Sequence, residues 1–171
     1  MTIKISLCKI EQLNLLRDVS IETYRDTFEE HNCEALMQQY FQDALNLEKL
    51  RQELKTQGSY FYFIYRNNEV AGLLKLNIDD AQSDDVDKNS LEIERLYIRK
   101  THLRQGLGKV LMQFAFDKGK EFNKPSAWLG VWENNLRALA FYKQLGFYQI
   151  GEHPFDMGGD IQTDLLMKKD L

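Results

Sequence analysis

The sequence predicts a single α/β (α+β) domain in which about seven strands form one sheet with helices around it. At 171 residues the chain has the length of one domain and can bury a sizeable core without metal or disulfide staples. Helical periodicity dominates the first third, and strand-like segments with two inserted helices follow it. Because the sequence contains no linker, repeat or low-complexity tract, we take residues 1–171 as one unit.

The first third is predicted to hold one strand and three helices. Residues 3–8 alternate apolar and polar side chains, as a half-buried strand does, and apolar residues then recur at helical spacing over residues 11–28. A second helix is predicted over residues 32–45. Asn46 is suited to cap a third helix, over residues 47–57, which ends at a glycine.

A hairpin is predicted next, with strands over residues 60–65 and 70–78. Asn67 and Asn68 join them, and asparagine tolerates the left-handed backbone conformation that a tight hairpin turn requires. A further strand follows over residues 90–98.

The rest of the chain alternates helix and strand. Gly146 is placed to cap the end of the second helix of this part, and Pro125 separates the first helix from the strand after it. The predicted elements are a helix (106–122), a strand (127–132), a helix (135–145) and a hairpin with strands 147–151 and 161–168 around a loop at 153–159.

Composition argues against several classes of protein. A net charge of -4 and a pI near 5.4 disfavour nucleic acid as a partner, since phosphate backbones require clustered Lys and Arg. With only Cys8 and Cys33, a secreted disulfide framework is not expected, and a reducing cytosol suits the chain. No signal-peptide core or membrane-spanning apolar run is evident, so we expect a soluble cytoplasmic protein without membrane contact.

Acidic residues gather in two places. One is the loop after the first hairpin and the other is the early helical region: Asp79, Asp80, Asp84, Asp85 and Asp87 in the loop, and Glu22, Asp26, Glu29, Glu30 and Glu34 in the helices. A solvated surface is the usual explanation, but such a field also attracts cationic substrates. The three histidines, His31, His102 and His153, do not have metal-ligand spacing, so we assign no metal.

Gly106 and Gly108 stand where a strand is followed by a glycine turn and a helix. Backbone N–H groups at a helix N-terminus lack partners and lie at the positive end of the helix dipole, so they can bind a phosphate. A tight turn that needs a positive φ is the alternative explanation. The Walker pattern requires Ser or Thr where this chain has Val110, and the Rossmann pattern requires Gly or Ala where it has Leu111. The remaining phosphate-binding interpretation is a shorter loop that binds a pyrophosphate.

Three motifs in this order resemble the GNAT superfamily of N-acetyltransferases. They are Ile93-Glu94-Arg95-Leu96-Tyr97-Ile98, Leu103-Arg104-Gln105-Gly106-Leu107-Gly108, and Asn135 with Ala138, Phe141-Tyr142 and Leu145-Gly146-Phe147. The resemblance extends from about Val70 to the end. Residues 128–133, 155–158 and 162–167 are similar to the bacterial PaiA-type spermidine/spermine N-acetyltransferases.

The resemblance implies a mixed, mostly antiparallel twisted sheet that splays between the strands at 90–98 and 126–132. Acetyl-CoA would lie in the gap like a missing strand, with no metal required. The residues that the resemblance assigns to the cofactor are Leu96, Tyr97, Ile98, Arg104, Gln105, Gly106, Leu107, Gly108, Lys109, Asn135, Tyr142 and Lys143. The family often has Arg or Gln followed by Gly where this chain has Leu103 and Arg104. Because the loop binds phosphate mostly through its backbone N–H groups, we expect this difference to change the side-chain contact of Arg104 and to leave the backbone cradle intact.

Acetyl transfer to an amine needs proton acceptors and donors. Only about one primary amine in 2,500 is neutral at pH 7, so a carboxylate must help to remove the proton. Glu92 and Glu94 are two apart on a strand and should share a face; the resemblance favours Glu94, with Glu92 second, and solvent-facing strand carboxylates are the alternative. The resemblance also assigns oxyanion binding to the Leu96 N–H and protonation of the thiolate to Tyr142.

Several of these residues also have purely structural explanations. Tyr142 could simply pack in the core, and Asn135 could cap a helix, bind CoA or do both. Trp128 and Trp132 alternate with apolar residues, which indicates sheet-core or pocket-wall aromatics. Gly130 could permit close approach of a ligand or mark a bulge.

The sequence therefore predicts an acetyl-CoA-dependent N-acetyltransferase that acts on a primary amine, with a polyamine such as spermidine or spermine as the expected acceptor. A protein lysine or N-terminal acetyltransferase, a non-catalytic acyl-CoA or polyamine-binding regulator and a nucleotide-binding fold are the alternatives. A homodimer that pairs through the C-terminal hairpin is left open.

Overall fold

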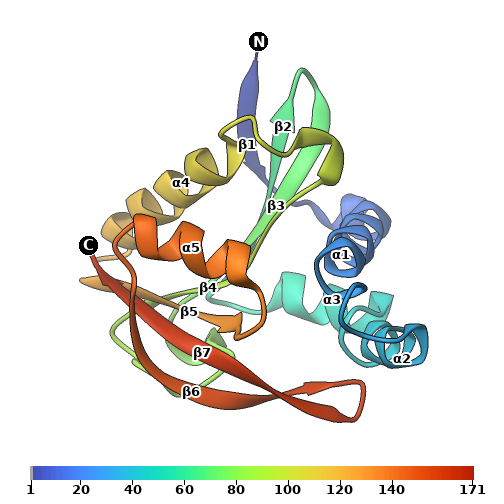
Figure 1. Ribbon diagram of the computed structural model, residues 1–171. Coiled ribbons are helices and arrows are strands. Elements are labelled where there is room, and N and C mark those ends of the chain that lie inside the picture. Colours follow the sequence, from blue (N-terminus) through green and yellow to red (C-terminus); the bar gives the residue numbers. More distant parts are fainter. Residues whose placement is uncertain (1) are drawn as a thin grey trace.

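The computed structural model describes residues 2–171 and contains one seven-stranded sheet in the order β1-β2-β3-β4-β5-β7-β6 (Figure 1). Neighbouring strands are antiparallel except β4 and β5, which are parallel. The strands are β1 (Ile3–Leu7), β2 (Ser59–Arg66), β3 (Glu69–Asn77), β4 (Leu91–Ile98), β5 (Ser126–Trp132), β6 (Tyr148–Met157) and β7 (Asp160–Asp170). The predicted mixed, mostly antiparallel sheet is confirmed.

In the described part of the chain, residues 2–171, five α-helices cover the two faces of this sheet. Helices α4 and α5 lie on one face, and α1, α2 and α3 lie on the other (Figure 1). They are α1 (Leu13–Phe28), α2 (Glu34–Ala44), α3 (Leu47–Lys55), α4 (Leu107–Glu121) and α5 (Leu136–Gln144). In residues 2–171 we find no helix with the length and apolar character that crossing a bilayer requires.

Each face of the sheet has its own apolar core. On the first face, Leu111 and Ala115 of α4 pack among buried residues of β3, β4 and β5. On the second, Leu16 of α1 and Leu50 of α3 pack against Phe63 and its neighbours in β2 and β3. Because successive strand residues point to opposite faces, each central strand contributes to both cores.

The sheet opens between β4 and β5. These strands pair only at Leu91 with Ala127 and at Glu92 with Trp128, and the pairing stops there. Immediately beyond that point β4 carries a bulge. Arg95 pairs with Lys75 and Ile93 pairs with Leu76. Glu94, which lies between Ile93 and Arg95, therefore has no partner in β3. A bulge bends its strand and increases the local twist. The predicted splay between these two strands is thus confirmed.

The C-terminal hairpin differs from the prediction. Residues 153–159 were expected to form a loop, but β6 continues to Met157 and the turn consists of Gly158 and Gly159, both with positive φ. Pro154 is accommodated because β6 is an edge strand, where a residue without an N–H leaves no ladder bond unmade. The longer hairpin reaches across to α2 (Figure 1).

Local signals at other positions are confirmed. Asn67 and Asn68 both adopt positive φ in the turn between β2 and β3. The side chain of Asn46 accepts a hydrogen bond from the Lys49 N–H at 2.8 Å and caps α3. Trp128 and Trp132 are buried, as expected for core or pocket-wall aromatics.

Candidate active site

The loop before α4 presents free backbone amides. Gly106 is the N-cap of α4 and has a φ of 77°, which is the positive φ that a tight turn at this position requires. The first intrahelical bond runs from the Val110 N–H to the Gly106 carbonyl at 3.2 Å, which leaves the N–H groups of Leu107, Gly108 and Lys109 without intrahelical acceptors. Three amides at the positive end of a helix dipole can bind an anion.

Gly108 has a separate packing role. A methyl group at this position would lie 3.4 Å from Cζ of Phe141 on α5. The glycine thus allows the start of α4 to approach α5 closely. The two helices together border the open end of the sheet (Figure 1).

We expect Gly106→Ala to lower the free energy of unfolding by about 1 kcal/mol and to weaken coenzyme A binding. An alanine would meet no atom within 4 Å, so the cost comes from the left-handed backbone alone. Urea denaturation and calorimetric titration with coenzyme A measure the two effects. Gly151→Ala in β6, where φ is not positive, is the matched control, and equal stability of the two variants would contradict this explanation.

The opened edge of β4 turns backbone groups toward the gap. The Arg99 N–H donates to the Ala71 carbonyl at 2.8 Å, and hydrogen-bonded pairs alternate along an antiparallel ladder. The N–H groups of Leu96 and Ile98 therefore point away from β3. Since β5 no longer pairs with β4 at this height, these groups face the gap.

Helix α5 places one polar and one phenolic side chain beside the same gap. Oδ1 of Asn135 accepts a hydrogen bond from the Ala138 N–H at 3.2 Å, so Asn135 caps α5. Helix capping was one of the two roles that the sequence predicted for this residue. Tyr142 packs between the rings of Phe141 and Phe147. Burial raises the pKa of Tyr142 to about 12, so its hydroxyl keeps the proton at neutral pH.

Glu94 belongs to a buried network of charges. The Nζ group of Lys75, a residue only 4% exposed, donates to both carboxylate oxygens of Glu94 at 3.0 Å and to Glu53 at 2.5 Å. Arg95, whose side chain is 13% exposed, places Nε 3.3 Å from Oε2 of Glu94. Burial acts to raise the pKa of Glu94, but the charges of Arg95 and Lys75 outweigh it and hold that pKa below its usual value.

Glu92 lies on the same face of β4 as Glu94, but its environment is different. Nδ2 of Asn77 donates to Glu92 at 2.9 Å and to Glu94 at 3.0 Å. Ser83 also donates to Glu92, through its N–H at 2.7 Å and through its hydroxyl. Burial and the charge of Glu94 raise the pKa of Glu92. Neither carboxylate is a solvent-facing strand residue.

One cleft of about 1700 Å³ brings most of the predicted site residues together. That volume exceeds the roughly 300–1,000 Å³ of an ordinary small-molecule pocket and suits two substrates at once. The predicted residues that line it are Glu92, Glu94, Leu96, Tyr97, Ile98, Arg104, Gly106, Leu107, Gly108, Lys109, Asn135 and Tyr142. Gln105 and Lys143 are exposed and do not line it.

The cleft also contains charged residues to which the sequence assigned no role. Lys75, Arg95, His153 and Asp164 line it from β3, β4, β6 and β7. One signal was available for Lys75, because it is a lysine inside an otherwise apolar strand, where an unpaired charge is not tolerated. No local signal distinguishes His153, which lay in the segment predicted to be a loop.

Comparison with known proteins identifies the class. Residues 18–147 match the family model described as the acetyltransferase (GNAT) family. An uncharacterised N-acetyltransferase from the pepI 3′ region of Lactobacillus delbrueckii subsp. lactis is 48% identical over 153 residues, 90% of this chain and 88% of that protein. The chain therefore belongs to the GNAT family and is an acetyl-CoA-dependent N-acetyltransferase.

More distant relatives share the fold or part of the sequence. The PaiA N-acetyltransferase of Thermoplasma acidophilum, crystallised with coenzyme A, superposes with a TM-score of 0.81 at 23% identity over all of both chains. A probable spermine N(1)-acetyltransferase from Bacillus subtilis subsp. natto is 24% identical over 94 residues, 54% of this chain and 62% of that protein. The first of these likenesses confirms the predicted fold.

Proposed function

We propose that this enzyme acetylates a small polyamine, such as spermidine or spermine. The observation that supports this acceptor is the charge of the cleft wall that β3, β4 and β7 form. Lys75 and Arg95 are matched by Glu53 and Glu94, to which they are ion-paired, so Glu92 and Asp164 add negative charge that these cations do not compensate. Excess negative charge on this wall attracts cations.

The names of two relatives agree with this acceptor. The Bacillus relative is named a probable spermine N(1)-acetyltransferase, and the Thermoplasma protein is named a PaiA N-acetyltransferase, the type that the sequence resembles. The proposal itself depends on the carboxylates of this chain.

The chain offers suitable groups to acetyl-CoA, which supplies the thioester from which the acetyl group leaves. The amides at 107–109 fit a diphosphate, and the Leu96 and Ile98 edge of β4 fits an extended amide-containing arm. We assign phosphate contacts to Arg104, Gln105, Lys109 and Lys143 as well. Leu96 N–H would donate to the oxyanion, and the Tyr142 hydroxyl would protonate the departing thiolate.

The two glutamates receive different tasks. Sequence resemblance favoured Glu94 as the proton acceptor, but two cations stabilise its charge and weaken it as a base. Glu92 has a raised pKa and is the better proton acceptor of the pair. We therefore propose that Glu92 takes the proton, directly or through water, while Glu94 holds the reacting nitrogen in the cleft.

We expect thiol release from acetyl-CoA to be faster with spermidine or spermine than with a lysine peptide or a peptide N-terminus. An amine panel with purified protein measures this preference. If a peptide outcompetes spermidine, the acceptor is a protein and not a polyamine. Absence of turnover with every amine would contradict the proposal.

Glu92→Gln should lower kcat at least tenfold at pH 7, and the loss should shrink at alkaline pH, where more of the amine is already neutral. Glu94→Gln should lose less in kcat than in the apparent affinity for the amine. A pH profile of both variants tests the assignment. The reverse pattern would return the role of base to Glu94.

A homodimer and a cytoplasmic location remain predictions. The edge strand β6 is half of the hairpin through which two subunits could pair. Light scattering of the purified protein measures its mass in solution, and a monomeric mass would contradict the dimer.

A further inference from the structure

The C-terminal hairpin forms a second polar wall of the cleft. His153 of β6 and Asp164 of β7 are direct partners in the sheet register, and both line the cleft. Nε2 of His153 lies 3.9 Å from Oδ2 of Asp164. The space above Gly130 of β5 is within reach of both, because a methyl group there would lie 3.5 Å from Oδ2 and 3.6 Å from Nε2.

The ring of His153 is oriented from its other side. Nδ1 lies 3.1 Å from Oδ2 of Asp84, which belongs to the loop between β3 and β4. A carboxylate at this distance holds the ring in one orientation. Nε2 then faces Asp164 and the space above Gly130.

Asp84 is itself held in place by its neighbours in the chain. Ser83 donates to Glu92, and Oε1 of Gln82 accepts from Nε1 of Trp128 at 2.6 Å. Three consecutive residues thus attach the loop to β4, β5 and β6. This attachment gives His153 a defined orientation at the cleft.

The carboxylate of Asp164 is the acceptor that this wall offers to the cleft. In residues 2–171, Asp164 has no hydrogen-bond donor, and its side chain is only 17% exposed. Burial raises the pKa of Asp164 to about 6, with the charge of His153 acting in the opposite direction, so it is a carboxylate at neutral pH. A largely desolvated carboxylate without a donor is unfavourable, and an ammonium group, which has donors only, would supply one.

Aromatic rings surround this part of the cleft. Trp132 of β5 is the register partner of Asp164, and Tyr24 and Tyr40 of the helical layer stack at 4.2 Å. These rings line the cleft together with Phe28 and Phe155. Aromatic faces attract cations, and a desolvated site strengthens that attraction.

We infer that Asp164, beside His153, binds a second ammonium group of the acceptor and so selects diamines and polyamines over monoamines. This inference rests on the proposed function, in which Glu94 holds the reacting nitrogen and Glu92 takes its proton. The charged groups around the site are Asp84 from the loop, Glu92, Glu94 and Arg95 from β4, and Lys75 from β3.

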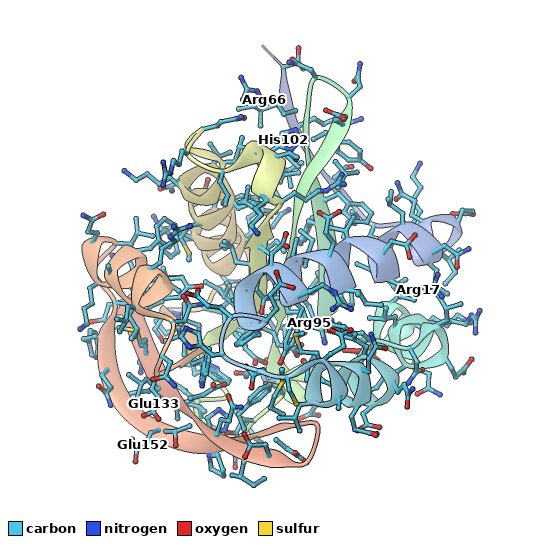
Figure 2. All side chains as sticks on the ribbon, turned by 45° about the vertical axis from the view of Figure 1, so that its right-hand side comes forward. Arg17, Arg66, Arg95, His102, Glu133 and Glu152 are labelled. Carbon is cyan, nitrogen blue, oxygen red and sulfur yellow. The ribbon has the colours of Figure 1, made fainter. Side chains whose placement is uncertain are left out.

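Matched substrates test the inference. With 1,4-diaminobutane as acceptor, Asp164→Asn should raise KM at least tenfold and change kcat less than twofold. With 1-aminobutane, which lacks the second ammonium, KM should change less than twofold. Glu152→Gln is the control, because Glu152 is a carboxylate at the outer surface of the same hairpin (Figure 2) and should leave both KM values unchanged.

A second variant fills the space without altering charge. Gly130→Ala should raise KM for 1,4-diaminobutane more than for 1-aminobutane, because the methyl group would occupy the position within reach of Asp164 and His153. Coenzyme A affinity, measured by calorimetry, separates this effect from damage to the other half of the cleft.

A binding measurement does not depend on turnover. The chain has three histidines, so the side-chain NMR signals of His153 can be assigned with His→Gln variants. In the complex with coenzyme A, 1,4-diaminobutane should shift the His153 signals in the wild-type protein and not in Asp164→Asn.

Two results would overturn the inference while leaving the polyamine proposal in place. One is an equal rise in KM for both substrates in Asp164→Asn, and the other is a diamine that binds without moving the His153 signals. If no amine is acetylated at all, the proposed function fails first, and the NMR titration still decides whether this wall binds a diamine.

Discussion

Tyr142→Phe is expected to lower kcat about 100-fold while coenzyme A affinity changes less than twofold. The substitution removes one hydroxyl and keeps the ring that packs between Phe141 and Phe147, so the fold and the wall of the cleft are retained. Proton donation by a positioned side chain contributes about 10²–10⁴-fold to a rate. Steady-state thiol release and calorimetric titration with coenzyme A measure the two quantities.

The direction of the pKa shift supports this role. Because burial raises the pKa of Tyr142 to about 12, the phenol is protonated throughout the neutral range, as an acid must be. Tyr148→Phe is the matched control, since Tyr148 is an exposed tyrosine of β6. An equal change of kcat in both variants would leave Tyr142 with a packing role only.

Lys75→Met is expected to lower the free energy of unfolding by about 3–5 kcal/mol. Its ammonium group is the shared partner of Glu53 and Glu94, and removal of one member of a buried charge network leaves the others uncompensated. Urea denaturation at neutral pH measures the loss. Lys4→Met, at an exposed residue of β1, is the control and should cost less than about 0.5 kcal/mol.

A double-mutant cycle identifies the cause of that loss. Glu94→Gln removes the charge that Lys75 would leave behind, so the double variant should lose less stability than the sum of the two single variants. Additive losses would indicate that the methionine disturbs packing instead. The departure from additivity measures the coupling free energy between Glu94 and Lys75.

The local signals in the sequence were sufficient for most elements. The asparagine turn between β2 and β3, the Asn46 cap and the glycine N-cap of α4 each act over a few residues and were predicted from those residues. The C-terminal hairpin was the exception. Its edge position, which makes Pro154 acceptable in a strand, depends on the order of strands across the whole sheet.

The roles of the charged residues could not be predicted in the same way. Glu92 and Glu94 are two residues apart, yet Glu94 contacts Lys75 and Arg95 while Glu92 contacts Ser83 and Asn77. Spacing along a strand predicted their common face. Their opposite pKa shifts depend on which cations lie within a few ångströms of each.

The sequence by itself determined the elements, the helix start that offers amides to an anion and the pair of glutamates on one strand, because these features follow from residues close together in the chain. Only the tertiary structure decided that Asp84 contacts His153 and that His153 and Asp164 lie above Gly130. They come from three segments, and their contact depends on strand pairing and on the attachment of a loop across the sheet. Electrostatic interactions act through space, so their outcome is known only once those distances are known.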